Sequence, residues 1–160
     1  MKATERFTLF WSGTFSQWHP SPFQINGVWY NCAEQYMMAE KARLFGNIRA
    51  EALIMASTDP SQQKSLGRAV VGFDAEKWAA VAKDIVYKAS YAKYTQNPDL
   101  RRELLATAGT TLVEASPNDT IWGIGLWKTD PRALDRKYWR GTNWLGEVLT
   151  KVRDELLTPE

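Results

Sequence analysis

The sequence has very little of the chemistry on which metal centres and nucleophilic hydrolases are usually built. Its 160 residues include one cysteine, Cys32, and one histidine, His19. One thiol and one imidazole are too few for the usual zinc cluster, and they leave a serine or cysteine nucleophile with a single candidate base. A single cysteine also excludes an internal disulfide and is compatible with a reducing compartment. We therefore expect no metal, no cofactor and a cytoplasmic location.

Long apolar runs and a strong charge of one sign are also missing. No run approaches the roughly 20 apolar residues that cross a bilayer, and the first residues lack the apolar core of a signal peptide. The formal net charge is +2, with Lys and Arg scattered among Asp and Glu. A nucleic-acid-binding surface normally needs concentrated positive charge. The sequence thus favours a small-molecule partner, with no membrane association.

What the chain has in excess is aromatic side chains. It contains eight tryptophans and six tyrosines, whose rings can stack on a planar ligand while a polar atom stays hydrogen-bonded. Any single tryptophan is more often simply packed in the interior. The length fits one domain with a sizeable core, so we expect a single domain over residues 1–160.

Local signals predict a mainly α domain with a small β element near the N-terminus. Residues 6–11 and 23–30 have strand character, and Asn26-Gly27 inside the second segment is a hairpin signal. A further short strand is expected at 110–116. Helices are expected at 32–45, 48–57, from Pro60, at 75–96, after Pro98 and at 143–157. The expected N-caps are Asn47, Asp59, Asp74 and Asn97. Between 117 and 142 the chain is irregular but rich in tryptophan, which is typical of a functional loop.

Glu34, near the start of the first expected helix, has two interpretations. Asn31 followed three residues later by Glu34 is a capping arrangement. Glu34 also begins a largely apolar row with Met38, Lys41 and Phe45 at helical spacing, which would direct its carboxylate inward. Carboxylates among aromatic rings suit reactions that pass through an oxocarbenium ion. Glu34 is therefore either a helix cap or a catalytic group.

Two other carboxylates, Asp119 and Glu114, are candidates for the same chemistry. Pro-Asn-Asp at 117–119 is also strong turn chemistry, so a structural role for Asp119 stays open.

Five segments occur in an order that resembles the NADAR, or YbiA-like, family. They read FSQWHPSPF, YNCAEQYMMAEKARLFG, SLGR, NDTIWGIGL and WRGTNWLGEVLTKVR. Together they extend from about residue 10 to residue 153. The resemblance implies a YbiA-like fold, mainly α and arranged as a compact orthogonal helical domain. It also implies an enzyme of the hydrolase class that acts on N-glycosyl bonds.

Three functions follow from this resemblance and are kept as hypotheses. The first is hydrolysis of the bond between ribose 5-phosphate and a pyrimidine amine in early riboflavin-pathway intermediates. The second is removal of ADP-ribose from guanine bases, the one case in which nucleic acid would be a partner. The third is a non-catalytic module that binds nucleotides or ADP-ribose.

The resemblance also carries roles to particular residues. Glu34 and Asp119 are the implied catalytic carboxylates, although which of them activates water and which stabilises the cation stays open. Stacking is expected from the tryptophans, and phosphate binding suits the planar guanidinium of Arg68, with Lys41 or Lys64 as weaker candidates. The full set of expected substrate-binding residues is Lys41, Arg68, Trp78, Asn118, Trp122, Gly123 and Asn143.

Overall fold

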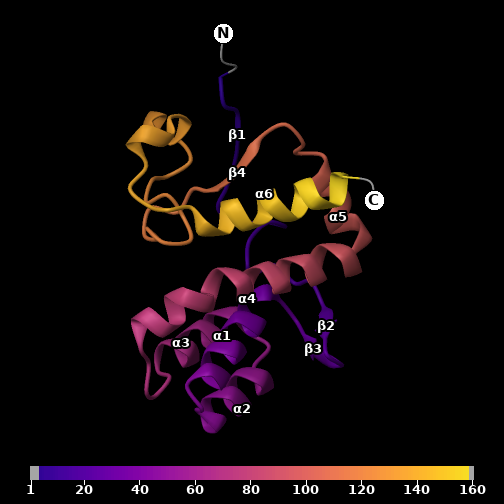
Figure 1. The fold of residues 1–160 in the computed structure, drawn as a ribbon, viewed down its shortest axis with the longest axis vertical. Helices are drawn as coiled ribbons and strands as arrows, with labels where there is room; N and C mark the ends of the chain where they lie inside the picture. The colour runs from indigo at the N-terminus through magenta and orange to yellow at the C-terminus, as the bar shows by residue number, and fades with distance from the viewer. Residues whose placement is uncertain (1–3, 159–160) are drawn as a thin grey trace. The chain divides into compact units, whose positions relative to one another are not determined.

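The structure is a computed structural model that describes residues 4–158. The chain clusters into two units (Figure 1). The central unit comprises Gln17–Pro98, and the terminal unit comprises Met1–Ser16 together with Asp99–Glu160. The expected single domain over residues 1–160 remains a prediction.

The central unit is built from a hairpin and four helices. Its elements are β2 (Phe23–Ile25), β3 (Val28–Tyr30), α1 (Ala33–Leu44), α2 (Ile48–Ala56), α3 (Pro60–Arg68) and α4 (Ala75–Gln96). The hairpin turn has positive φ at Asn26 and Gly27, as a two-residue type I′ turn requires. Helices α2 and α4 begin as predicted, because Asn47 accepts a hydrogen bond from the Ala50 amide and Asp74 accepts from Glu76 and Lys77.

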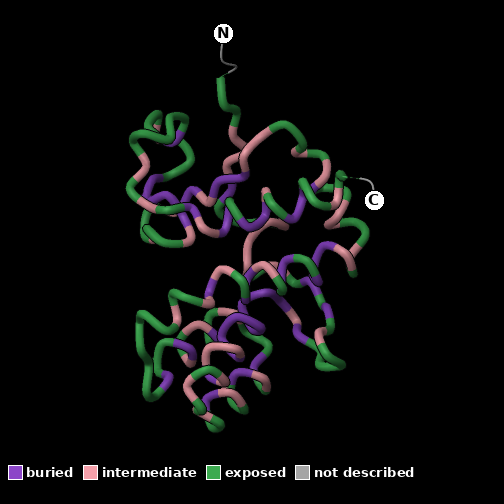
Figure 2. Tube along the Cα trace, in the orientation of Figure 1, coloured by how far each residue is buried: buried purple, intermediate pink, exposed green. Residues whose placement is uncertain are grey.

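Helix α1 forms the core of the central unit. Helices α2, α3 and α4 all pack against it, and Figure 2 shows α1 as largely buried. Ala33, Ala39 and Ala42 are wholly inaccessible to solvent. A helix buried on most of its faces is stabilised chiefly by tertiary packing. Polar side chains on α1 are consequently held in place by three neighbouring helices.

The terminal unit combines a parallel strand pair with the C-terminal helix. Its elements are β1 (Phe7–Phe10), α5 (Pro98–Leu105), β4 (Thr111–Glu114), the 3₁₀ turns η1 (Pro131–Leu134) and η2 (Arg136–Tyr138), and α6 (Trp144–Leu157). Strands β1 and β4 pair in parallel, with Phe7 opposite Thr111 and Phe10 opposite Glu114. In sequence, the whole central unit lies between them. A small apolar cluster of Val113, Ala115, Ile124, Leu126 and Ala133 lies beside this pair.

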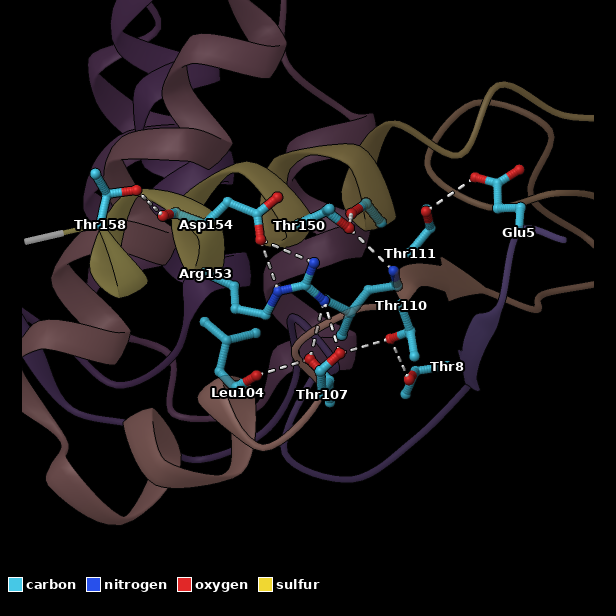
Figure 3. A network of polar contacts seen from close by, with 12 residues as sticks. Glu5, Thr8, Leu104, Thr107, Thr110, Thr111, Thr150, Arg153, Asp154 and Thr158 are labelled. Carbon is cyan, nitrogen blue, oxygen red and sulfur yellow. Dashed lines mark hydrogen bonds and ion pairs between the residues drawn. The ribbon is translucent and has the colours of Figure 1, made fainter. Parts of the chain in front are cut away.

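A buried arginine fixes α6 to the segment that precedes β4 (Figure 3). Arg153 Nη1 donates to the carbonyl oxygen and the hydroxyl of Thr107, at 3.0 and 3.2 Å. Nearby, the Thr150 hydroxyl accepts from the Leu112 amide at 2.9 Å. Only 3 % of Arg153 is exposed, and its guanidinium donates to groups of Thr107 and Asp154 within the protein. We assign it a structural role.

The expectation of a mainly α fold is confirmed, with one detail corrected. Helix α5 begins at Pro98, directly after Asn97, as expected. The side-chain Nδ2 of Asn97 donates to the carbonyls of Lys93 and Pro22 at the end of α4, and its role as the N-cap of α5 remains a prediction. Helix α1 begins one residue later than the capping interpretation required, with Cys32 at the N-cap. Within residues 4–158, no helix is long and apolar enough to cross a membrane.

Candidate active site

Glu34 lies in the first turn of α1 and is 4 % exposed. Its amide donates to the Gln17 carbonyl at 3.0 Å. The expected capping box around Asn31 and Glu34 is wrong. The Asn31 amide donates instead to Oε1 of Gln35, at 2.7 Å. Because Gln35 takes the reciprocal position, the first-turn geometry gives no support to Glu34 as a cap, and its burial agrees with the inward direction predicted from the apolar row.

Lys41 lies two turns along α1 from Glu34 and contacts two aromatic rings. Its Nζ is 4.6 Å from the ring centroid of Phe73 and 5.8 Å from that of Trp78. Partial burial lowers the pKa of Lys41; the charge of Glu34 opposes this shift and the charge of Arg68 adds to it. Both ions are therefore close enough to Lys41 to act on it electrostatically.

Arg68 reaches this position because α3 packs tightly on α1. A Cβ at the preceding residue, Gly67, would collide with the Met38 side chain. The glycine thus permits the close approach of the two helices, and Arg68 is the last residue of α3. We call Glu34, Lys41, Arg68, Phe73 and Trp78 the Glu34 cluster. Lys64, the other expected phosphate ligand, lies over a different ring, that of Trp18.

The candidate residues of the terminal unit form a tightly hydrogen-bonded loop. Oδ1 of Asp119 accepts from the amides of Ile121 and Trp122 at 2.9 and 2.8 Å, so the expected turn chemistry is present. A Cβ at Gly123 would lie 2.9 Å from the Glu114 carbonyl and 3.0 Å from that of Asp119. Only glycine fits this space without displacing backbone. Asn118 is exposed at the edge of the loop.

Asn143 is fully buried and holds strand β4. Its Oδ1 accepts from the Glu114 amide at 2.9 Å, and its Nδ2 donates to the Leu112 carbonyl at 3.0 Å. The residue has a left-handed backbone with φ of 54°, a conformation that asparagine adopts more readily than most residues. Its side-chain amide thus has a structural function that the sequence did not indicate. Substrate binding by Asn143 remains a prediction.

Trp122 is held by the start of the last helix. Its carbonyl accepts from the Leu145 amide at 3.1 Å, and its ring packs edge-on against Trp144 with centroids 5.5 Å apart. The carbonyl of Ile121 likewise accepts from the Trp144 amide. The loop therefore satisfies amides of the first turn of α6 that would otherwise have no partner in the helix.

A hollow of about 450 Å³ lies elsewhere in the central unit, between β2 and α4. Ile25, Tyr87 and Tyr91 are among its lining residues, and it includes none of the Glu34 cluster. It has volume but no convergent charged groups, whereas the Glu34 cluster brings a buried carboxylate, two cations and two rings together. Chemistry therefore favours the Glu34 cluster as the active site. Among residues 4–158 there is no group of three or more His, Cys, Asp or Glu side chains that could hold a metal ion.

Two residues of interest were missed from the sequence. Phe73 lies under Lys41, and its position just before the Asp74 cap gave no signal of this contact. Lys93 is 2 % exposed. It continues the inward-facing row of α4 four residues after Ala89, where the period of the row predicts an apolar side chain. A lysine at a position where an apolar residue is expected could have indicated from the sequence that Lys93 is unusual.

Residues 9–157 match the family model described as NADAR domain. The chain belongs to the NADAR family. Every candidate residue lies within the matched region. The family resemblance deduced from the sequence is thereby confirmed.

Known proteins agree with this assignment. Protein irg-1 of Caenorhabditis elegans is 41 % identical over 97 % of this chain and 82 % of its own length. N-glycosidase R617 of Acanthamoeba polyphaga mimivirus is 44 % identical over 88 % of this chain and 86 % of its own. The solution structure of Escherichia coli YbiA superimposes with a TM-score of 0.78 at 28 % identity, covering 97 % of this chain and 87 % of YbiA. These matches confirm the YbiA-like fold, and the name of the viral relative agrees with the expected hydrolase of N-glycosyl bonds.

Proposed function

We propose that this NADAR protein is an N-glycosidase that separates ribose 5-phosphate from the pyrimidine amine of an early riboflavin-pathway intermediate. The observation that carries the proposal is the Glu34 cluster, in which a buried carboxylate interacts electrostatically with a lysine flanked by two rings. A maize relative named "Riboflavin biosynthesis protein PYRR, chloroplastic" supports the substrate class. It is 31 % identical over 91 % of this chain, which spans 23 % of that protein.

The carboxylate of Glu34 suits a reaction at the anomeric carbon. The first turn of a helix favours a negative charge, because the backbone amides there point toward it. An ionised carboxylate beside C1 stabilises the positive charge that develops on the sugar, or removes a proton from the attacking group. Burial strengthens both effects, since the local dielectric constant is lower than that of water.

Lys41 and Arg68 suit the phosphate of the same substrate. Two cationic side chains can balance the charge of a phosphate dianion, and the guanidinium of Arg68 provides paired hydrogen-bond donors. Seven residues along a helix correspond to a rise of about 10 Å. Both side chains lean toward the N-terminus of the helix, so this rise sets the scale of the span between the Glu34 carboxylate and the Lys41 amine. A ribose 5-phosphate could then meet Glu34 at one end and the cations at the other, with Trp78 and Phe73 beside it.

Asp119 stays a predicted catalytic residue on the family resemblance. The hydrogen bonds that its Oδ1 accepts from the amides of Ile121 and Trp122 would keep its carboxylate in a fixed orientation, which suits such a role. Asn118, Trp122, Gly123 and Asn143 stay predicted substrate-binding residues on the same ground.

A product assay on the wild-type protein tests the proposal. An aminopyrimidine ribonucleotide 5′-phosphate and an ADP-ribosylated guanine nucleotide are offered separately, and the sugar products are separated by chromatography. We expect ribose 5-phosphate from the first substrate. Release of ADP-ribose alone would replace the proposed substrate with the guanine adduct. Binding of either compound with no product would indicate the non-catalytic module instead.

A further inference from the structure

Phe73 is an aromatic residue whose packing alone does not explain its presence. It lies in the loop between α3 and α4, and 47 % of it is exposed. Its ring centroid is 4.6 Å from Nζ of Lys41, and the ring packs edge-on against that of Phe45 with centroids 5.5 Å apart. About half of the residue stays in water, so burial alone gives little reason for an aromatic ring here. The contact with the Lys41 ammonium group is therefore its most specific interaction.

The loop that carries Phe73 is anchored at both ends. Val70 is 6 % exposed and fixes the start of the loop in the interior. Gly72 turns the chain with a φ of 82°, a left-handed conformation that glycine adopts without strain. Directly after Phe73, Asp74 caps α4 by accepting hydrogen bonds from two amides of its first turn. The position of the Phe73 ring thus follows from the backbone on either side of it.

Lys41 has a second aromatic neighbour, Trp78, in the first turn of α4. Its Nζ is 5.8 Å from the Trp78 ring centroid, so both rings lie within the roughly 6 Å over which a cation is attracted to an aromatic face. Partial burial lowers the pKa of Lys41, and the like charge of Arg68 adds to this effect. The two rings act in the opposite direction because they attract the charged form of the amine. They therefore favour the ammonium ion that phosphate binding requires.

Exposure increases across the Glu34 cluster. Glu34 is 4 % exposed and Lys41 is partly buried, whereas Arg68 is exposed. A phosphate dianion is strongly hydrated and is costly to bury without paired charges. The part of the cluster with Lys41, Arg68 and Phe73 therefore suits a phosphate, and the buried carboxylate suits the sugar.

We propose that Phe73 is a positioning residue that holds the Lys41 ammonium group where it binds the substrate phosphate. This inference rests on the proposed N-glycosidase function, in which Lys41 and Arg68 meet that phosphate. A lysine has a long, flexible side chain, and ordering it on binding costs free energy. A ring that already holds the ammonium group reduces this cost. Phe73 thus affects substrate binding through Lys41, without touching the substrate.

Steady-state kinetics on the full-length protein test this role. Phe73→Leu removes the ring and should raise KM for the aminopyrimidine ribonucleotide about fivefold, with kcat changed less than about twofold. Phe73→Tyr keeps an aromatic face and should restore the wild-type KM. The unphosphorylated nucleoside lacks the group that Lys41 binds, so its KM should be equal in all three proteins. A wild-type KM in Phe73→Leu that melts as a folded protein, or an equal rise for the nucleoside, would overturn the inference and leave the proposed function intact.

A double variant tests whether Phe73 acts through Lys41. Lys41→Met combined with Phe73→Leu should raise KM no further than Lys41→Met alone, because the ring then has no ammonium group to hold. Effects of the two substitutions that multiply independently would overturn the inference.

Tyr91→Leu is the matched control. Tyr91 lies in the same unit, is 45 % exposed and packs against the ring of Tyr87, which is outside the Glu34 cluster. Its replacement removes a similar aromatic surface and should leave KM unchanged. An equal rise of KM in Tyr91→Leu and Phe73→Leu would overturn the specific role of Phe73.

If the wild type hydrolyses neither substrate, the proposed function fails and nuclear magnetic resonance still decides about Phe73. Protein with isotope-labelled lysine gives a Lys41 signal that is assigned by its loss in Lys41→Met. Ring currents should move the ε-methylene protons of Lys41 upfield in the wild type and in Phe73→Tyr, and less in Phe73→Leu. Added inorganic phosphate should shift this signal with an affinity several-fold weaker in Phe73→Leu. A Lys41 signal at the same position in wild type and Phe73→Leu, or a response to phosphate that is absent or equal in the two, would overturn the inference.

Discussion

The two sets of candidate residues use their polar atoms in different ways. In the terminal unit, the side chains of Asp119 and Asn143 are hydrogen-bonded to backbone groups and hold a loop and a strand. In the central unit, Lys41 lies beside aromatic rings and is affected by the charges of both Glu34 and Arg68. Residues in the same family motifs thus divide into those that build the scaffold and those suited to chemistry.

This difference separates two kinds of experimental effect. Where a side chain satisfies buried backbone groups, its removal leaves them without partners and lowers stability. Where a side chain acts mainly through its charge, its removal changes binding or turnover and affects folding little.

The largest effect is expected from removing the charge of Glu34. Glu34→Gln keeps the shape of the side chain but removes the base, so kcat should fall by about 10²- to 10⁴-fold, the usual range for a general acid or base. Stability should change by less than about 1 kcal/mol. Glu40→Gln, on the same helix and in an ion pair with Arg43, is the matched control and should retain kcat.

Asn143→Ala should give the largest loss of stability. It leaves the Glu114 amide and the Leu112 carbonyl without their partner, at about 1–3 kcal/mol each, and it puts alanine in a left-handed conformation. We expect a loss of about 3 kcal/mol or more in urea unfolding. Asn143→Gly should be about 1 kcal/mol less destabilised, because glycine tolerates the positive φ. Two variants as stable as the wild type would contradict the structural role.

The stability of the protein should depend on pH through Lys93. The folded pKa of about 7 lies below the unfolded value, so between these values the unfolded state binds the extra proton. Stability should therefore rise with pH above 7, by up to about 1.4 kcal/mol per unit from this group. Urea unfolding between pH 7 and 8.5 should show this slope in the wild type and a much smaller one in Lys93→Met. An unchanged slope would show that Lys93 is not its source.

A smaller effect is expected from the cations that we propose for the phosphate. Arg68→Gln and Lys41→Met should each raise KM for a phosphorylated substrate about tenfold, which corresponds to about 1.4 kcal/mol, with little change in melting temperature. Arg49→Gln removes an exposed arginine of α2 in the same unit and serves as the control. Equal KM values in all three variants would place the phosphate site elsewhere.

The smallest effect on stability is expected from Asp119→Asn. The asparagine oxygen can still accept from Ile121 and Trp122, so unfolding should shift by less than about 0.5 kcal/mol, against about 1–2 kcal/mol for Asp119→Ala. Because Asp119→Asn removes only the charge, its turnover isolates the predicted catalytic role, and we expect at least a tenfold loss. Wild-type turnover would restrict Asp119 to its function in the loop.

Much of the fold could be predicted because its signals are local. The turn at Asn26-Gly27 and the helix starts at Asn47, Asp59 and Asp74 depend on short-range hydrogen bonds and backbone preferences, which neighbouring residues reveal. The parallel pairing of β1 with β4 could not be predicted, because the two strands are separated by the whole central unit.

The candidate site could likewise be predicted only where local sequence signals determine it. The inward direction of Glu34 followed from helical spacing. The contact of Lys41 with Phe73 and the gathering of Lys93 and Cys32 at the start of α1 depend on how separate helices pack. The left-handed backbone of Asn143 and its bonds to β4 depend on the close fit of the loop, which no local pattern encodes.

Substrate binding and turnover measured on one sample of Glu34→Gln test the central claim most directly. Calorimetry gives the dissociation constant for the aminopyrimidine ribonucleotide, and a single-turnover assay of the same solution gives the rate of ribose 5-phosphate release. We predict a dissociation constant within a few-fold of the wild-type value and a rate lower by at least a hundredfold. A folded variant that releases ribose 5-phosphate at the wild-type rate would contradict the assignment of Glu34 to catalysis.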